Sequence, residues 1–426
     1  MQLLSLANPA AQDGDQGDNA QSFHQRLLSF IPGVIAGAAD LDPAAVLTAT
    51  VAGASFGYSI AWVVLLCIPV LYSVFAVASR LGSETRRGLV ELIKMRYGAK
   101  GAFPIALCMI VVNFAMIIGD IVAVSDSLSL ILNLPRYFFL AVVGFVVWYI
   151  LILGDFNKTT KILGSFSLIL IAYVFAAWHV TPSFPALAHG VFVPHLQATS
   201  DYLMAVIAVF GSLLTPNVIV WQISTKRDLP QASARAAYSR SDNDKSESHA
   251  GTFVACLISL SVIVAASHLH VTDASSMTTR IAAEALRPLG AIGPILFSIG
   301  IIGSGLVALP ILLASLCFSV AEAFGWESGL SKAPWEARFF YAMVSAVIAG
   351  AVAIDYFSVN TVKVLYWSQV IAGIVLVPIF IFILLLANDR KIMRTVNTRF
   401  ENVWLVAAVI GMAISNLFFF WMSYFH

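Results

Sequence analysis

Long apolar stretches recur along almost the whole chain, and they constrain its fold more than any other feature. A helix that crosses the hydrocarbon core of a bilayer needs about 20 apolar residues. Stretches of roughly that length occur at residues 31–53, 58–81, 104–132, 137–154, 162–180, 202–224, 250–271, 294–323, 338–356, 361–387 and 403–425. Barrel strands are shorter and alternate polar with apolar residues. The sequence therefore predicts an all-α integral membrane protein with about eleven transmembrane helices.

The composition agrees with lipid as the main solvent of the chain. Hydrophobic residues make up 59% of the sequence and charged residues only 11%, whereas about a quarter of the residues of a soluble domain are charged. The net charge of +1 argues against a nucleic-acid partner. We expect the lipid bilayer as the environment, with no nucleic acid, no obligate protein partner and no cofactor.

The distribution of basic residues predicts an orientation in the membrane. Cytoplasmic loops carry an excess of Lys and Arg. With a cytoplasmic N-terminus and eleven spans, 20 of the 24 basic residues fall in cytoplasmic loops, and the C-terminus lies outside. The outer loops keep only Arg136, Arg280, Arg287 and Lys363. The short loops and compact length favour the inner membrane of a bacterium.

The first apolar stretch contains a break with two carboxylates. The motif GAADLDPAA places Asp40 and Asp42 well inside the stretch, and Pro43 follows at once. Proline removes a backbone donor and clashes with the preceding turn. Open backbone is tolerated at membrane depth only where it lines a protein cavity, and acids there are costly. We interpret Asp42, and also Asp40, as functional residues rather than as parts of a simple kink.

The sixth stretch repeats this design in the motif GSLLTPN, where Pro216 lies between Thr215 and Asn217. Breaks in the first and sixth helices indicate two inverted five-helix repeats, and such paired breaks mark the binding site of many transporters. The predicted organisation is a disordered cytosolic tail at 1–27, a first repeat at 28–180, a second at 181–387 and an additional helix at 388–426. The oxygen atoms at the two breaks favour hard divalent cations such as Mg²⁺, Mn²⁺ or Ca²⁺.

At these breaks the sequence resembles the NRAMP family of divalent-metal transporters. The family carries Asp-Pro-Gly-Asn in its first helix and Met-Pro-His in its sixth. Here the matching residues are Asp42-Pro43-Ala44-Ala45 and Thr215-Pro216-Asn217. The resemblance covers roughly the first ten spans and implies the LeuT-type fold of 5+5 inverted repeats. The segments 52–66 and 366–378 also look like the family, whereas 215–222 and 305–326 look like its bacterial branch that includes magnesium transporters.

The resemblance implies a metal site built from one carboxylate, polar side chains of the sixth and tenth helices, and backbone carbonyls. Asp42 matches the family's metal-binding aspartate, and Gln369 matches a polar residue of the tenth helix that approaches the metal. The implied set is Asp42, Thr215, Asn217 and Gln369 with the backbone carbonyls of Ala39 and Ser212. We add Asp40 to this set, because it could compensate for a lost ligand.

Several positions depart from the family's pattern. The usual Asn ligand is Ala45, and the usual methionine is Thr215, which removes the soft sulfur that favours transition metals. The sixth-helix histidines are absent, and Asn217 stands in the first of their positions. Asp120 keeps the acid that begins the family's proton route in the third helix, but the glutamate of that route is Ala123. Asp120 is therefore a candidate for a proton route or for the cavity wall.

The leading hypothesis is a secondary transporter that imports hard divalent cations, Mg²⁺ or Mn²⁺, by alternating access. The alternative keeps the fold and carries a small organic solute such as an amine or amino acid. The chain has no HExxH motif, no Gly-x-Ser-x-Gly motif and no phosphate loop, so we do not expect an enzyme. Asp126 lines a polar cavity or lies at the outer mouth, and Glu322 is expected at the membrane interface.

Overall fold

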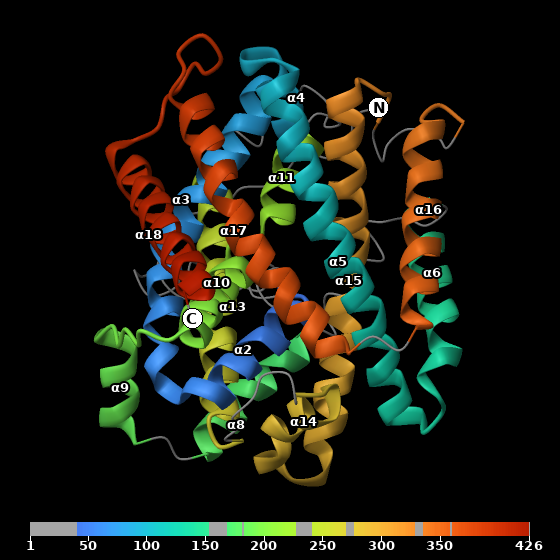
Figure 1. Ribbon diagram of the computed structural model, residues 1–426, viewed down its shortest axis with the longest axis vertical. Helices are drawn as coiled ribbons and strands as arrows, with labels where there is room; N and C mark the ends of the chain where they lie inside the picture. The colour runs from blue at the N-terminus through green and yellow to red at the C-terminus, as the bar shows by residue number, and fades with distance from the viewer. Residues whose placement is uncertain are drawn as a thin grey trace, which may run out of the picture.

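The computed structural model describes residues 41–152, 168–180, 183–226, 241–269, 277–328, 335–357 and 360–425, and all regular structure in this part of the chain is helical (Figure 1). The elements in chain order are α2 (Pro43–Phe56), η1 (Gly57–Ile60), α3 (Trp62–Thr85), α4 (Leu89–Tyr97), α5 (Ala99–Leu132), α6 (Arg136–Ile152), η2 (Leu168–Ile171), α8 (Ala172–His179), α9 (Phe184–Phe192), α10 (Ser200–Leu213), α11 (Pro216–Thr225), α13 (Ser241–Ala266), α14 (Thr279–Ala283), η5 (Glu284–Ile292), α15 (Gly293–Phe324), α16 (Arg338–Asp355), α17 (Thr361–Ala387) and α18 (Arg399–Phe425).

The lengths of these helices confirm the predicted class of protein. Within the described residues, eight helical segments are long and apolar enough to cross a membrane. Three shorter apolar helices, Arg136–Ile152, Leu168–His179 and Gly251–Ala266, lie where the fourth, fifth and seventh spans are predicted. The all-α integral membrane class is confirmed, whereas the total of eleven spans stays a prediction. The first half of the first predicted span lies outside the described residues.

The two longest helices, α5 and α15, form the central pair of the bundle (Figure 1). They run antiparallel, because the ring of Phe103 near the start of α5 packs on Phe324 at the end of α15, with 5.3 Å between ring centroids. At the opposite end of the pair, Gly305 of α15 leaves room for Val124 of α5 and for Pro43 of α2. A side chain at Gly305 would collide with Val124, so this glycine lets α2 approach the pair.

A second close contact joins α10 to α17. Gly211 of α10 lies against the backbone of Gln369 and Gly373, and Gly373 lies against the backbone of Ile207. Neither glycine has room for a Cβ atom. Small residues at helix interfaces of this kind let two backbones pack closely in a membrane, where packing rather than burial from water drives association. The contact fixes the middle of α17 beside the end of α10.

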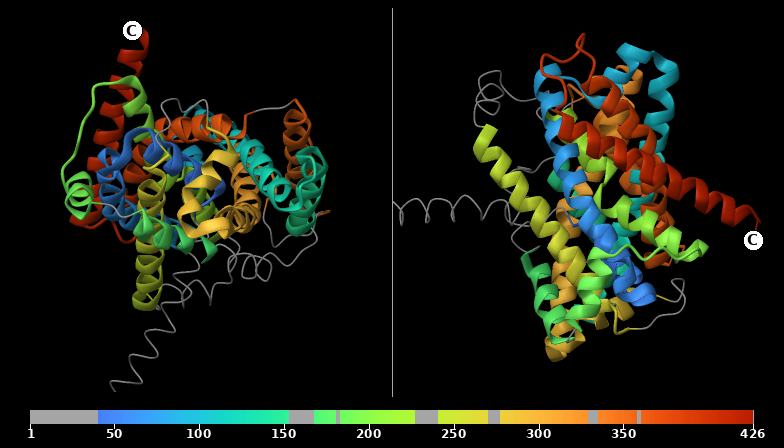
Figure 2. Two further views of the ribbon diagram at one scale, coloured as in Figure 1. Left: turned by 90° about the horizontal axis from the view of Figure 1, so that it is seen from below. Right: turned by 90° about the vertical axis from the view of Figure 1, so that its left-hand side faces the viewer.

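The last helix, α18, lies at the edge of the bundle and projects from it at its C-terminal end (Figure 2). Only 28% of the apolar 18-residue stretch of α18 is buried inside the protein, compared with 89% for the corresponding stretch of Ser200–Ser224. This peripheral position agrees with a helix added to a ten-helix core. The predicted boundaries of the two repeats stay predictions, and the predicted tail at 1–27 lies outside the described residues.

Candidate functional site at the helix breaks

The predicted break in the sixth span lies between α10 and α11. Helix α10 ends at Leu213, Thr215 has a non-helical backbone with φ −30° and ψ 114°, and α11 begins at Pro216. Proline has no N–H and is well suited to the first position of a helix, so it ends one helix and begins the next. The carbonyl four residues before it, that of Ser212, therefore has no helical donor. The missing N–H of Pro216 thus leaves the Ser212 carbonyl, which the family resemblance predicts as a ligand, without a helical hydrogen bond.

Asp42 lies at the start of α2, directly after the part of the first span that is outside the described residues. It is the N-cap residue, and its Oδ1 accepts a hydrogen bond of 2.6 Å from the backbone N–H of Ala45. Pro43 occupies the first helical position. The N-terminus of a helix carries a partial positive charge, which stabilises a carboxylate there. Asp42 is 3% exposed, so its charge is held inside the protein at the helix end.

Gln369 brings a buried amide to the same region from the middle of α17. The side chain is fully buried, and neither Oε1 nor Nε2 has a hydrogen-bond partner in the described part of the chain. On α11, the Oδ1 atom of Asn217 is likewise buried without a partner. Buried polar atoms are almost always paired in native proteins, and each exception calls for an explanation such as an ion or water. Within the part of the chain that the structure describes, these amide atoms have no protein partner.

Asp120 faces α2 from α5. It is fully buried, its carboxylate interacts with the backbone N–H of Ala44 in the first turn of α2, and its charge interacts with that of Asp42. Helix α2 packs against α5, α10 and α17, and α11 contacts α5 and α17. The structure thus places the predicted residues Asp42, Asp120, Thr215, Asn217, Ser212 and Gln369 on five neighbouring elements.

Two of the predicted site residues, Ala39 and Asp40, lie outside the described residues. Sequence reasoning also missed Thr48 of α2, whose Oγ1 is buried and has no partner in the described part of the chain. A hydroxyl six residues beyond Asp42 in an apolar helix is the signal that could have found it. Thr215 is 2% exposed at the break, and its role as a ligand stays a prediction.

The donor set is made of hard oxygen atoms. No group of three or more His, Cys, Asp or Glu side chains that could hold a metal occurs within the residues the structure describes. Carboxylate, amide and carbonyl oxygens suit cations such as Mg²⁺, Mn²⁺ and Ca²⁺, and soft thiolate ligands are absent from the described site. Among the described residues, a bundle of apolar helices with a break between α10 and α11, a helix start at Pro43 and central polar groups is typical of membrane carriers of the secondary-transporter class.

Comparison with known proteins is consistent with this class and identifies the family. The family model described as natural resistance-associated macrophage protein-like, Nramp, matches residues 33–422, and the chain belongs to this family. The chain is 27% identical over 410 residues to the divalent metal cation transporter MntH of Deinococcus radiodurans, covering 92% of this chain and 89% of that relative.

Solved structures agree on the fold. The Eremococcus coleocola manganese transporter matches with a TM-score of 0.68 at 14% identity, over 96% of this chain and 88% of that one. MhsT, solved in complex with L-phenylalanine, matches with a TM-score of 0.56 at 14% identity, over 93% of this chain and 98% of that one. The LeuT-type fold expected from the resemblance is confirmed.

Proposed function

We propose that this chain is a secondary transporter that imports a hard divalent cation, Mn²⁺ or Mg²⁺, by alternating access between the two faces of the membrane. The observation that carries the proposal is the group of buried oxygen atoms around Asp42 at the two helix breaks. MntH of Deinococcus radiodurans is named a divalent metal cation transporter, which supports the same cargo class. The chain would act as a carrier and not as an enzyme.

In this proposal Asp42 is the principal anionic ligand. The amide oxygens of Asn217 and Gln369 and the hydroxyl of Thr215 supply further oxygens, either directly or through waters that the ion keeps, as Mg²⁺ prefers. The carbonyl of Ser212 is available because Pro216 has no N–H to offer it. We keep the backbone carbonyl of Ala39 and the side chain of Asp40 in the proposed set, although both residues lie outside the described part of the chain.

Asp120 has a different proposed role. Its carboxylate interacts with the backbone N–H of Ala44 and electrostatically with Asp42. Two carboxylates that share a small buried space are difficult to ionise together, because their charges repel at low dielectric. Arrival of a divalent cation at Asp42 would offset this repulsion, so Asp120 could release a proton or tune the charge of the cavity.

The proposed location is the inner membrane of a bacterium, with the N-terminus in the cytoplasm. The end of the bundle that carries α4 and the loop between α17 and α18 is the top of Figure 1. Basic side chains gather on these segments, and the opposite end has few. The excess of basic residues in cytoplasmic loops supports this assignment of the two faces. From here on, the α4 end is called the inner face and the α14 end the outer face.

The test is uptake of Mn²⁺ into proteoliposomes, with Mg²⁺ and Ca²⁺ as competitors. We expect saturable uptake that Mg²⁺ inhibits, and a loss of at least about tenfold in Asp42→Ala, because a charged ligand contributes more than 1.4 kcal/mol to cation binding. The matched control is Asp201→Ala, which removes an exposed aspartate in the first turn of α10.

Two outcomes would contradict the proposal in different ways. Full uptake by Asp42→Ala would remove Asp42 from the site but leave the cargo in place. No uptake and no saturable divalent binding by folded wild-type protein would overturn the cation assignment. The organic-solute alternative, an amine or amino acid, would then stand first, because the fold is shared with MhsT, which was solved with L-phenylalanine.

A further inference from the structure

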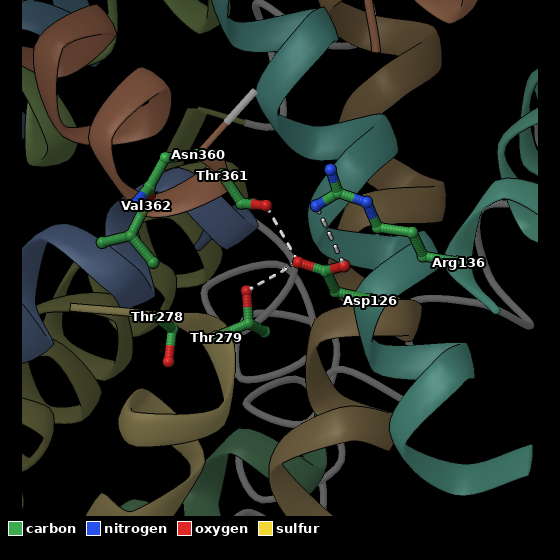
Figure 3. A pocket seen from close by; sticks show the side chains of 7 residues that line it. All are labelled: Asp126, Arg136, Thr278, Thr279, Asn360, Thr361 and Val362. Atoms are coloured by element: carbon green, nitrogen blue, oxygen red, sulfur yellow. Dashed lines mark hydrogen bonds and ion pairs between the residues drawn. The ribbon is translucent and has the colours of Figure 1, made fainter. Parts of the chain in front are cut away.

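Asp126 joins three elements at the outer end of α5. Its Oδ2 accepts hydrogen bonds from the hydroxyl of Thr279 at 3.0 Å and from the hydroxyl of Thr361 at 2.8 Å. The guanidinium of Arg136 lies 3.7 Å from Oδ1. These side chains line a cavity of about 310 Å³ and point toward one another (Figure 3). One carboxylate therefore links α5 to the first residues of α14, α17 and α6, at the outer mouth rather than in the substrate site.

Glu322 links α15 to two other helices, α11 and α4, at the inner end of α15. Its Oε1 accepts a 2.8 Å hydrogen bond from the hydroxyl of Ser224, and its Oε2 accepts from the backbone N–H groups of Val90 at 3.1 Å and Glu91 at 3.4 Å. The residue is 5% exposed. Glu322 lies at the inner end of α15, and its depth at the membrane interface stays a prediction, but its side chain is buried inside the protein. It is buried because the N-terminus of α4 and the end of α11 both bring donors to it.

The two networks correspond in the helix that carries the acid and in the short helix that it contacts, but not in their third partners, Thr361 of α17 and Ser224 of α11. α5 and α15 are the third and eighth predicted spans, which correspond to each other in an inverted repeat of five and five helices. Each acid lies in the last two turns of its helix, and each accepts hydrogen bonds at the N-terminus of a short helix, α14 or α4. These short helices lie at opposite ends of the bundle (Figure 1). The outer network thus has an inverted counterpart at the inner face.

Each network also fixes the end of a helix that carries a site residue. Thr361 begins α17, and Gln369 follows eight residues later in the same helix. Ser224 lies near the end of α11, seven residues after Asn217. With both networks formed, Asn217 is 3% exposed and Gln369 is fully buried. The sealed state of the site coincides with two intact networks, one at each face.

We propose that Asp126 and Glu322 are positioning residues that hold the two faces of the transporter closed, each through hydrogen bonds to a helix that lines the site. Opening toward the outer face breaks the bonds of Asp126 to Thr361 and Thr279, while the bonds of Glu322 stay intact. Opening toward the inner face breaks the bond of Glu322 to Ser224, while the bonds of Asp126 stay intact. A ligand or bond shifts such an equilibrium only by its difference in free energy between the states.

The test measures access to the site from each face, and it does not depend on what the cargo is. A cysteine at Thr215, introduced after replacement of Cys67, Cys108, Cys256 and Cys317, reports access through its reaction with a membrane-impermeant thiol reagent. Met95→Cys on α4 and Arg287→Cys in η5 mark the two faces, because both side chains are exposed. Vesicles of both orientations then give the labelling rate from each face.

We expect Asp126→Asn to raise labelling of the reporter from the outer face by roughly tenfold and to leave labelling from the inner face unchanged. Glu322→Gln should do the reverse. Thr361→Val and Ser224→Ala remove one hydrogen bond each and keep the carboxylate, so they give the same pattern with a smaller change. Thr361→Val and Ser224→Ala also test the proposal if Asp126→Asn or Glu322→Gln fails to fold. Labelling that rises equally from both faces, or that does not change in any folded variant, would overturn the proposal.

Discussion

Gln369 in α17 and Arg80 in α3 are both polar side chains in largely apolar surroundings, but their hydrogen bonding is opposite. Arg80 donates to both carboxylate oxygens of Glu401, at 3.0 and 2.9 Å, and to Oδ1 of Asn397 at 2.6 Å. The amide of Gln369 has no partner in the described part of the chain. Arg80 lies at the inner face, where it joins α3 to α18, whereas Gln369 lies at the centre of the bundle.

We interpret polar groups that are hydrogen-bonded within the protein, such as Arg80, as groups that stabilise the fold. Buried polar groups without a protein partner, such as Gln369, are interpreted as groups that bind the transported substrate. A buried amide without partners costs about 1–3 kcal/mol, and a chain keeps such a group only where something outside the chain repays the cost. Both terminal nitrogens of Arg80 are paired within the protein, with Glu401 and Asn397, and only its Nε atom has no partner among the described residues. Stability and transport should therefore respond in opposite ways when the two kinds of residue are replaced.

The largest effect on stability is expected for Arg80→Leu. The change leaves the carboxylate of Glu401, which is 7% exposed, without its guanidinium partner, and breaking a buried pair costs about 3 kcal/mol. The free energy of unfolding in detergent should fall by that amount, while uptake per folded molecule should stay near the wild-type value. Arg87→Leu is the matched control. Its Nε atom lies 3.7 Å from Oε1 of Glu91, which is a long distance for an ion pair, and the two side chains are 43% and 32% exposed. Equal stability of the two variants would contradict the assignment.

Gln369→Leu should change function without a loss of stability. Because the variant removes two unpaired polar atoms from the core, the free energy of unfolding should stay constant or rise by about 1 kcal/mol. Cation uptake should fall about tenfold, which corresponds to 1.4 kcal/mol of lost binding. Ser368→Ala is the control, since its hydroxyl already donates to the carbonyl of Leu365 at 2.7 Å. If Gln369→Leu unfolds the protein, the amide is a structural group and the comparison fails.

The same contrast explains what the sequence could predict. The membrane spans depend on local hydrophobicity, and the break at Pro216 depends on a missing N–H, so both could be read from neighbouring residues. Asp42 could also be predicted from neighbouring residues, because it is a carboxylate inside an apolar span directly before Pro43. Gln369, in contrast, could be found only through the family resemblance, because no feature of its own helix distinguishes it.

Contacts between distant segments could not be predicted. The burial of Glu322 was not predicted, because nothing near it in the sequence shows that Ser224 and the N-terminus of α4 bring donors to it. Thr48 was missed for a similar reason, since a threonine in an apolar helix commonly bonds to its own backbone. Only the packing of α2 shows that its hydroxyl has no partner among the described residues. Tertiary context decides which polar groups are satisfied.

Thr215→Met tests whether the residue at the break between α10 and α11 contributes to cation preference. The change introduces a soft thioether at the position where the family usually has methionine. A thioether favours thiophilic cations over hard ones. Uptake of Cd²⁺ relative to Mg²⁺ should therefore rise several-fold, which corresponds to about 1 kcal/mol. Thr215→Leu has a similar volume without sulfur and is the matched control. An equal shift in both variants would show that size at this buried position, and not ligand chemistry, sets the preference.

The smallest effect is expected for Asp389 between α17 and α18, whose side chain is paired and 16% exposed, next to the more exposed side chain of Arg96. The backbone N–H of Lys391, at 2.9 Å, and the side chain of Arg96, at 2.7 Å, lower the pKa of the Asp389 carboxyl below its ordinary value. A lowered pKa in the folded state stabilises the fold above the unfolded-state pKa of about 3.9, and this contribution is lost as the pH falls through the folded-state pKa.

Asp389→Asn should therefore lower the unfolding temperature slightly at pH 7, and salt should reduce the difference because it screens exposed charges. As the pH falls below about 4, the wild-type carboxyl takes up its proton and the two proteins should converge. Thermal unfolding in detergent at pH 7 and at pH 3 checks both points. A difference that grows on acidification would mean that Asp389 is stabilised as the neutral acid, which would contradict its pairing with Arg96. The pairing of Asp389 with Arg96 would then be insufficient to identify Asp389 as a residue that stabilises the fold.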